Sequence, residues 1–173
     1  MSGDFTLITL PLLVLPILVI LAGLTDLTTM KIPNWISIAL LFSFYPVALL
    51  MGLSLAEVAL ATAVGSGMLL AGMAMFALRW MGGGDAKLLA TAGLWMGVPG
   101  ILPFILMTAI AGGGLCLVLM SARAWLQVYQ PAMPGWGQRL LQPKGDIPYG
   151  VAIAAGALMA YPHSALVEKF LFI

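Results

Sequence analysis

Five long stretches of this sequence carry no Asp, Glu, Lys or Arg, and they limit the chain to one class of protein. They cover residues 5–24, 35–56, 58–78, 88–121 and 147–166. A helix needs about 20 mostly apolar residues to cross a bilayer, so each stretch is long enough to span a membrane. Charged residues make up 8% of the chain, against about 25% in soluble domains. This composition excludes a soluble enzyme, a nucleic-acid-binding protein and a disordered protein.

The longest uncharged stretch, residues 88–121, contains 34 residues. As one helix it would be roughly 50 Å long, which is too long for one upright span. Pro99-Gly100 lies near its middle and is typical of a turn, so we interpret the stretch as two helices. The sequence therefore predicts an all-α, polytopic bundle of about six transmembrane helices, forming one domain over residues 1–173. Residues 122–147 form a loop within it.

The fourth predicted helix is short unless it begins before the uncharged stretch. It reaches about 17 residues, the lower limit for a span, only if it starts near Gly83. Asp85 and Lys87 then lie in its first turn, and Asp85 is not a free loop residue. A carboxylate costs up to ~3 kcal/mol at the bilayer centre and less near the interface.

The basic residues predict the orientation of the bundle. Six spans place most of them on one side, which the positive-inside rule assigns to the cytoplasm; these are Lys31, Arg79, Lys87, Arg123, Arg139 and Lys144. Only Lys169 falls on the other side. We expect a multi-pass protein of the bacterial cytoplasmic membrane, with both termini outside. The aromatic residues of the loop, Trp125, Tyr129 and Trp136, indicate either an interfacial segment or a docking surface.

Two acidic residues are predicted to meet at the cytoplasmic side. Asp26 ends the first helix and Asp85 begins the fourth, so both lie at one membrane level. Two facing carboxylates can share a proton, so that one acts as general base on water and the other as acid. A metalloprotease or serine protease would need histidines that are missing, because His163 is the single histidine and lies near the outer end. No metal or cofactor is expected.

Short motifs follow these acids in order along the chain. Ile32-Pro33-Asn34 comes after Asp26, Gly82-Gly83-Gly84-Asp85-Ala86-Lys87 surrounds Asp85, and Pro148-Tyr149-Gly150 opens the last predicted helix. Together they resemble the type IV prepilin peptidase family, the bacterial branch of the GxGD membrane aspartyl proteases. The resemblance covers nearly the whole chain.

The resemblance implies that Asp26 and Asp85 are the catalytic aspartates of an endopeptidase. It implies cleavage, at the cytoplasmic membrane face, of a basic leader from prepilin-like precursors with a hydrophobic helix. The motif residues expected to support the site are Pro33, Asn34, Gly82, Gly84, Lys87, Pro148, Tyr149 and Gly150. Longer members carry paired cysteines linked to methyl transfer, whereas this sequence has only Cys116. It therefore resembles the short form of tight-adherence (Flp-type) pilus systems, and methyltransferase activity is not expected.

Two other functions remain open from the residues alone. Intramembrane acids also mark ion paths, so a proton or ion transporter subunit is one alternative. A non-catalytic assembly factor of a pilus or secretion machine is the other. Asp26 could be an interfacial helix-end acid, and Asp85 an acid favoured by the helix dipole. The partners expected in all cases include membrane lipid and exclude nucleic acid, and Asp146 is a reserve acid on the same face.

Overall fold

The computed structural model describes residues 10–143 and 145–171, and in this part of the chain every regular element is a helix. The elements are η1 (Leu10–Leu13), α2 (Val14–Thr29), α3 (Asn34–Leu50), α4 (Leu55–Ala77), α5 (Gly83–Trp125), η2 (Gln127–Ala132), α6 (Gly135–Leu140), α7 (Tyr149–Ala160), η3 (Tyr161–His163) and α8 (Ala165–Leu171). The all-α prediction is confirmed.

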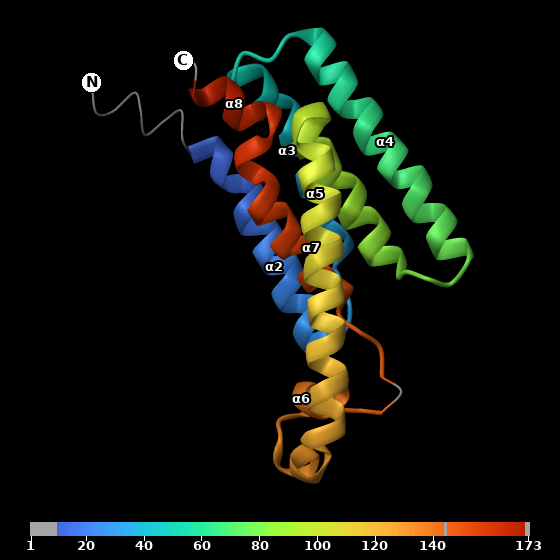
Figure 1. Ribbon diagram of the computed structural model, residues 1–173. Helices are drawn as coiled ribbons and strands as arrows, with labels where there is room; N and C mark the ends of the chain where they lie inside the picture. Colours follow the sequence, from blue (N-terminus) through green and yellow to red (C-terminus); the bar gives the residue numbers. More distant parts are fainter. Residues whose placement is uncertain (1–9, 144, 172–173) are drawn as a thin grey trace.

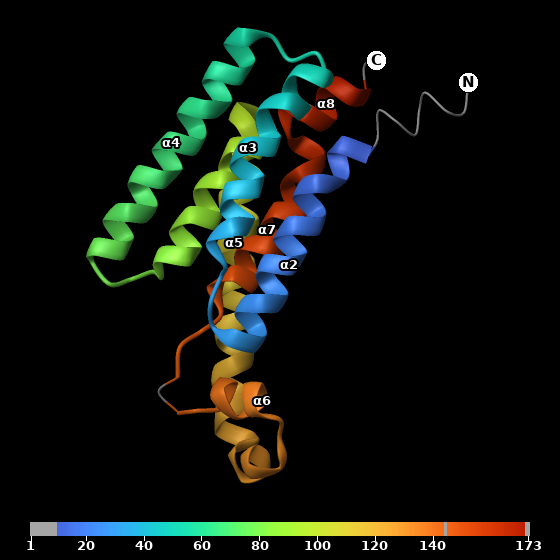
Figure 2. The same ribbon diagram turned by 180° about the vertical axis from the view of Figure 1, so that it is seen from behind.

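Helix α5 is in fact two helices that meet at Gly97. This residue has φ 61° and ψ −166°, a backbone conformation that glycine adopts readily. Figures 1 and 2 show that the chain reverses here, so that residues 83–96 and residues 98–125 run in opposite directions. The predicted division into two helices is confirmed, but its position was wrong by about two residues. Pro99 belongs to the first turn of the second helix, where its missing N–H leaves no bond unmade.

The remaining boundaries follow the predicted spans with shifts of a few residues. Among the residues that the structure describes, four helical segments are long and apolar enough to cross a membrane, and α3 is a shorter apolar helix. The first helix extends to Thr29, so Asp26 lies inside its last turn and is not its last residue. The fourth starts at Gly83, as predicted. The last predicted span is interrupted by η3 and continues as α8. Residues 5–9 of the first predicted span lie outside the described residues.

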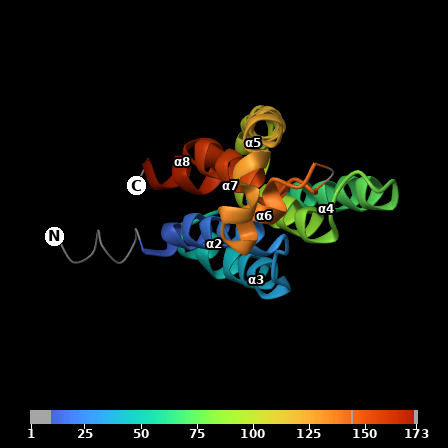
Figure 3. The same ribbon diagram turned by 90° about the horizontal axis from the view of Figure 1, so that it is seen from below.

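Small residues let α7 pack closely between α2 and α5. Gly23 on α2 faces Ala154, and a Cβ at Gly156 would overlap the backbone of Thr108 on α5. Helix α4, in contrast, packs mainly against α5, where Gly65 and Gly72 allow close approach. Viewed from below in Figure 3, α4 lies at the edge of the bundle, away from α2 and α7. The chain is thus a multi-pass membrane protein with a compact side and a looser side.

The charged loops gather at one end of the bundle. The end of α2, the α4–α5 turn and α6 lie toward the lower end of Figure 1, whereas α8 lies at the upper end. The described basic residues therefore separate as expected, with Lys169 on α8 opposite the others. Lys144 and both termini lie outside the described residues. The assignment of the lower end to the cytoplasm remains a prediction.

The predicted 122–147 loop is partly helical. The C-terminal end of α5 projects beyond the neighbouring helices, and η2 and α6 fold back beside this projecting end (Figure 1). Trp125 and Tyr129 are exposed on this projection, and Trp136 is more than a third exposed. Arg123 connects the end of α5 to α6, because its Nε donates to the carbonyl oxygen of Leu140 at 2.8 Å.

Candidate active site

Asp26 is held firmly in the compact side of the bundle. It lies in the last turn of α2 and is only 6% exposed. The backbone N–H of Gly150, in the first turn of α7, donates to its Oδ2 at 2.8 Å. Gly150 has no side chain that would separate the two, since a Cβ there would lie 2.8 Å from the same oxygen. The Pro148-Tyr149-Gly150 motif therefore fixes the carboxylate of Asp26.

Asp85 is held more loosely, at the start of α5. Gly82 is the N-cap residue, and Asp85 is the third residue of the helix. A carboxylate at this position reaches back toward the N-cap backbone, as in a capping box. The Asp85 carboxylate lies against Gly82, because a Cβ built on Gly82 would be 2.9 Å from Oδ2. Asp85 is only partly buried.

Both carboxylates line one open cavity of about 1040 Å³. The two residues are 59 positions apart in the sequence, and the fold brings them to the wall of the same cavity. In the described residues neither forms a salt bridge. The cavity wall also includes residues of the end of α4, the α4–α5 turn, the segment before α7 and the start of α7, which are Met75, Phe76, Arg79, Trp80, Met81, Ile147 and Tyr149.

A third acid lies at the edge of the same cavity. Asp146 is exposed and lines it, together with Gly145. Nη2 of Arg123 donates to the backbone oxygen of Asp146 at 2.8 Å. Because Arg123 also binds Leu140, it ties the end of α5 to the segment that forms this wall.

The predicted supporting residues divide between two places. Gly82 and Tyr149 line the carboxylate cavity. Gly84 packs against Ile32, where a Cβ would lie 3.2 Å from the Ile32 side chain, so this glycine allows close approach of the α2–α3 connection. Pro148 is buried and caps α7.

Asn34 and Lys87 face a different pocket. Lys87 Nζ donates to Asn34 Oδ1 at 2.9 Å, and both residues line a groove between α3 and α4. Asp85 and Lys87 are two residues apart, or about 200° around a helix, which explains why they face opposite sides of α5. Pro33 precedes Asn34 as the N-cap residue of α3.

Sequence reasoning missed several parts of this site. The α4–α5 turn, with Arg79 and Trp80, was identified only as a basic loop, but it forms one wall of the cavity. The bond from Gly150 to Asp26 was also missed. The sequence contained one signal for it, since a glycine after a helix-starting proline offers an unpaired N–H in the first turn.

Other reactive groups lie away from the cavity. His163 is in η3, near α8, and Cys116 lies on the projecting part of α5 with Met120 as its neighbour. Within residues 10–143 and 145–171, no three His, Cys, Asp or Glu side chains are grouped so that they could hold a metal ion.

Comparison with known proteins gives one match. The model of the type IV leader peptidase family matches residues 13–117, a range that includes Asp26, Asp85 and more than half of the chain. No curated protein and no solved structure matches. The matched range runs from α2 to the projecting part of α5, and the chain belongs to the type IV leader peptidase family.

Proposed function

We propose that this peptidase is an aspartic endopeptidase in which Asp26 and Asp85 together activate a water molecule. The observation that carries the proposal is that both carboxylates line one open cavity near the end of the bundle where the basic loops gather. In a membrane-spanning segment a carboxylate is costly, so acids placed there are functional by default. Helix capping alone would not require two acids from distant helices to reach the same cavity.

The reaction follows from the shared proton of the pair. The ionised carboxylate takes a proton from water while the water oxygen attacks the scissile carbonyl carbon. The protonated carboxyl donates its proton to the carbonyl oxygen, which gives a tetrahedral intermediate. When the C–N bond breaks, the carboxyl that took the water proton passes it to the leaving nitrogen, and the other carboxylate takes a proton from one hydroxyl of the intermediate, so the pair again holds one proton. The N–H of Gly150 keeps the Asp26 carboxylate oriented during these steps.

The proposed substrate is a prepilin-like precursor that presents its leader at the cytoplasmic face of the bacterial membrane. The openness of the cavity beside the α4–α5 turn supports this, because an extended peptide needs access to both carboxylates. The basic residues at this end support its assignment to the cytoplasm. The same proposal includes that this protein is the short-form peptidase of a tight-adherence pilus system.

The test is cleavage of a pilin precursor by Asp26→Asn and Asp85→Asn in membranes, followed on a gel. We expect both variants to accumulate to normal levels and to leave the leader uncut. Asp146→Asn is the matched control, because Asp146 is exposed at the cavity edge, and we expect it to cut. Full processing by either of the first two variants would refute the pairing. Precursor-independent ion flux in liposomes that is lost in the same variants would favour the transporter alternative instead.

A further inference from the structure

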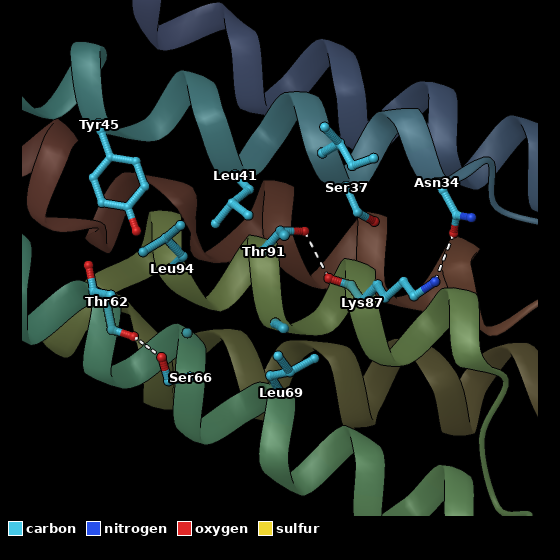
Figure 4. Close-up of a pocket in the computed structure, with 13 residues that line it drawn as sticks. Asn34, Ser37, Leu41, Tyr45, Thr62, Ser66, Leu69, Lys87, Thr91 and Leu94 are labelled. Carbon is cyan, nitrogen blue, oxygen red and sulfur yellow. Dashed lines mark hydrogen bonds between the residues drawn. The ribbon is translucent and has the colours of Figure 1, made fainter.

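We propose that the groove between α3 and α4 binds an anionic phospholipid, with Lys87 at its phosphate and one acyl chain along the groove. The groove has a volume of about 390 Å³ and lies on the opposite side of α5 from the carboxylates. Its floor is formed by Lys87, Ala90, Thr91 and Leu94 of α5. Figure 4 shows α3 residues along one wall and α4 residues along the other.

The positive charge of Lys87, at one end of the groove, favours an anionic headgroup. Lys87 Nζ binds the neutral Asn34 amide oxygen, and no acid lies within salt-bridge distance of it in the part of the chain that the structure describes. An ammonium has three donors, so it can bind a phosphate oxygen while it keeps Asn34. Basic pockets between transmembrane helices on the cytoplasmic side bind anionic lipid headgroups in this way.

The residues that line the groove suit an acyl chain, although several of them carry hydroxyl groups. Three of these hydroxyls already donate to backbone oxygens of their own helices: Thr62 to Val58 at 2.8 Å, Ser66 to Thr62 at 2.8 Å, and Thr91 to Lys87 at 3.0 Å. These three present little unpaired polarity to a ligand, while the hydroxyls of Ser37 and Tyr45 also line the groove. The apolar residues of the two walls are exposed at the groove, as with Ile38 on α3 and Leu69 on α4.

The groove runs along α5 for about two helical turns. Lys87 and Leu94, which both line it, are seven residues apart on α5, or about 10 Å. A single acyl chain lying along it would contact both α3 and α4.

The experiment measures lipid association by electron paramagnetic resonance in phosphatidylcholine bilayers. Trace spin-labelled phosphatidylglycerol or spin-labelled phosphatidylcholine serves as the probe, and the motionally restricted fraction is compared. We expect wild type to favour the anionic probe about fivefold, the factor for one lysine near a membrane surface. Lys87→Gln should remove this preference, whereas Arg139→Gln, the same charge change on α6, should keep it.

A second variant controls for poor folding of Lys87→Gln, and added competitors distinguish the possible occupants of the groove. Ser66→Phe keeps Lys87 but fills the groove, so it should lower the preference even if Lys87→Gln folds poorly. Inorganic phosphate in the buffer should not displace the probe, since the acyl chain contributes to binding. An equal preference in wild type and both groove variants would overturn the proposal. So would displacement of the probe by a hydrophobic single-span peptide but not by unlabelled phosphatidylglycerol, because the groove would then be a peptide site.

Discussion

Asp26 and Asp85 line the same cavity but are held in different ways. Asp26 lies between closely packed helices, is 6% exposed and receives the N–H of Gly150. Asp85 lies in the first turn of α5, is only partly buried and rests against Gly82. The comparison indicates that one carboxylate is fixed by the fold while the other has room to adjust.

The largest effect should come from disturbing the fixed carboxylate. In Gly150→Ala the new Cβ would lie 2.8 Å from Oδ2 of Asp26 and 2.7 Å from Ile32 Cδ1. A displacement of about 1 Å at a catalytic group costs on the order of 100-fold in rate, so we expect a loss of that size in leader cleavage. Gly113→Ala is the matched control, since no described residue lies within 4 Å of its Cβ. Equal rates for the two variants would mean that the position of Asp26 is not critical.

A smaller effect should follow the corresponding change beside Asp85. In Gly82→Ala the new Cβ meets only the Asp85 carboxyl group, at 2.9 Å from Oδ2. The side chain can turn away at a rotamer cost of about 0.5–1.5 kcal/mol, so we expect up to about a tenfold loss of cleavage. Rates are measured with the same precursor and equal membrane levels. If Gly82→Ala were more harmful than Gly150→Ala, the roles of fixed and adjustable carboxylate would have to be exchanged.

A third prediction concerns the wall of the cavity. Arg123→Met removes the bonds to the backbone oxygens of Leu140 and Asp146. Hydrogen bonds from a charged group contribute about 1.5–3 kcal/mol each, so the segment before α7 should open more often. We expect faster proteinase K cutting near residue 143 in membranes and a few-fold loss of cleavage of the precursor. Arg139→Met, which removes a charge without these bonds, should change neither readout.

The smallest effect on cleavage should come from the other side of α5. Trp95 is fully buried, and its Nε1 donates to the carbonyl oxygen of Leu40 at 2.8 Å. Trp95→Phe removes this hydrogen bond, at a cost of about 0.5–1.5 kcal/mol, and also removes volume, although the Leu40 oxygen still accepts from the Ser43 hydroxyl at 3.4 Å. We expect a lower unfolding temperature in detergent, with leader cleavage unchanged well below it. A large loss of cleavage at low temperature would show that the α3 side is coupled to the carboxylates.

Much of the fold could be predicted because each membrane-spanning helix needs a long apolar stretch, which is visible in the sequence. Because a span needs about 20 apolar residues, the sequence predicted about six helices and a start of the fourth near Gly83. The break in the long stretch was placed at Pro99-Gly100, but the reversal uses Gly97. The reason is that a proline fits the first turn of a helix, whereas the reversal itself needs a positive φ.

The site was predictable only in part because contacts between helices leave little trace in the sequence. The acids Asp26 and Asp85 could be paired by their common membrane level. Their surroundings could not, since hydropathy does not say which face of a helix meets which neighbour. Lys87 was therefore grouped with Asp85 on motif proximity, although it faces the groove. The bonds of Arg123 depend on how α6 folds back, which no periodicity in residues 122–147 indicates.

The most direct test of the central claim measures whether the two carboxylate positions face one cavity that receives the precursor. Asp26→Cys and Asp85→Cys are combined with Cys116→Ala, and a short bifunctional thiol reagent is added to membranes. We predict an intramolecular cross-link, found by mass spectrometry and slowed by the precursor, which this inactive variant cannot consume. Asp26→Cys with Lys169→Cys, at the other end of the bundle, should not cross-link. Absence of the first cross-link, or a rate that the precursor leaves unchanged, would contradict a shared catalytic cavity.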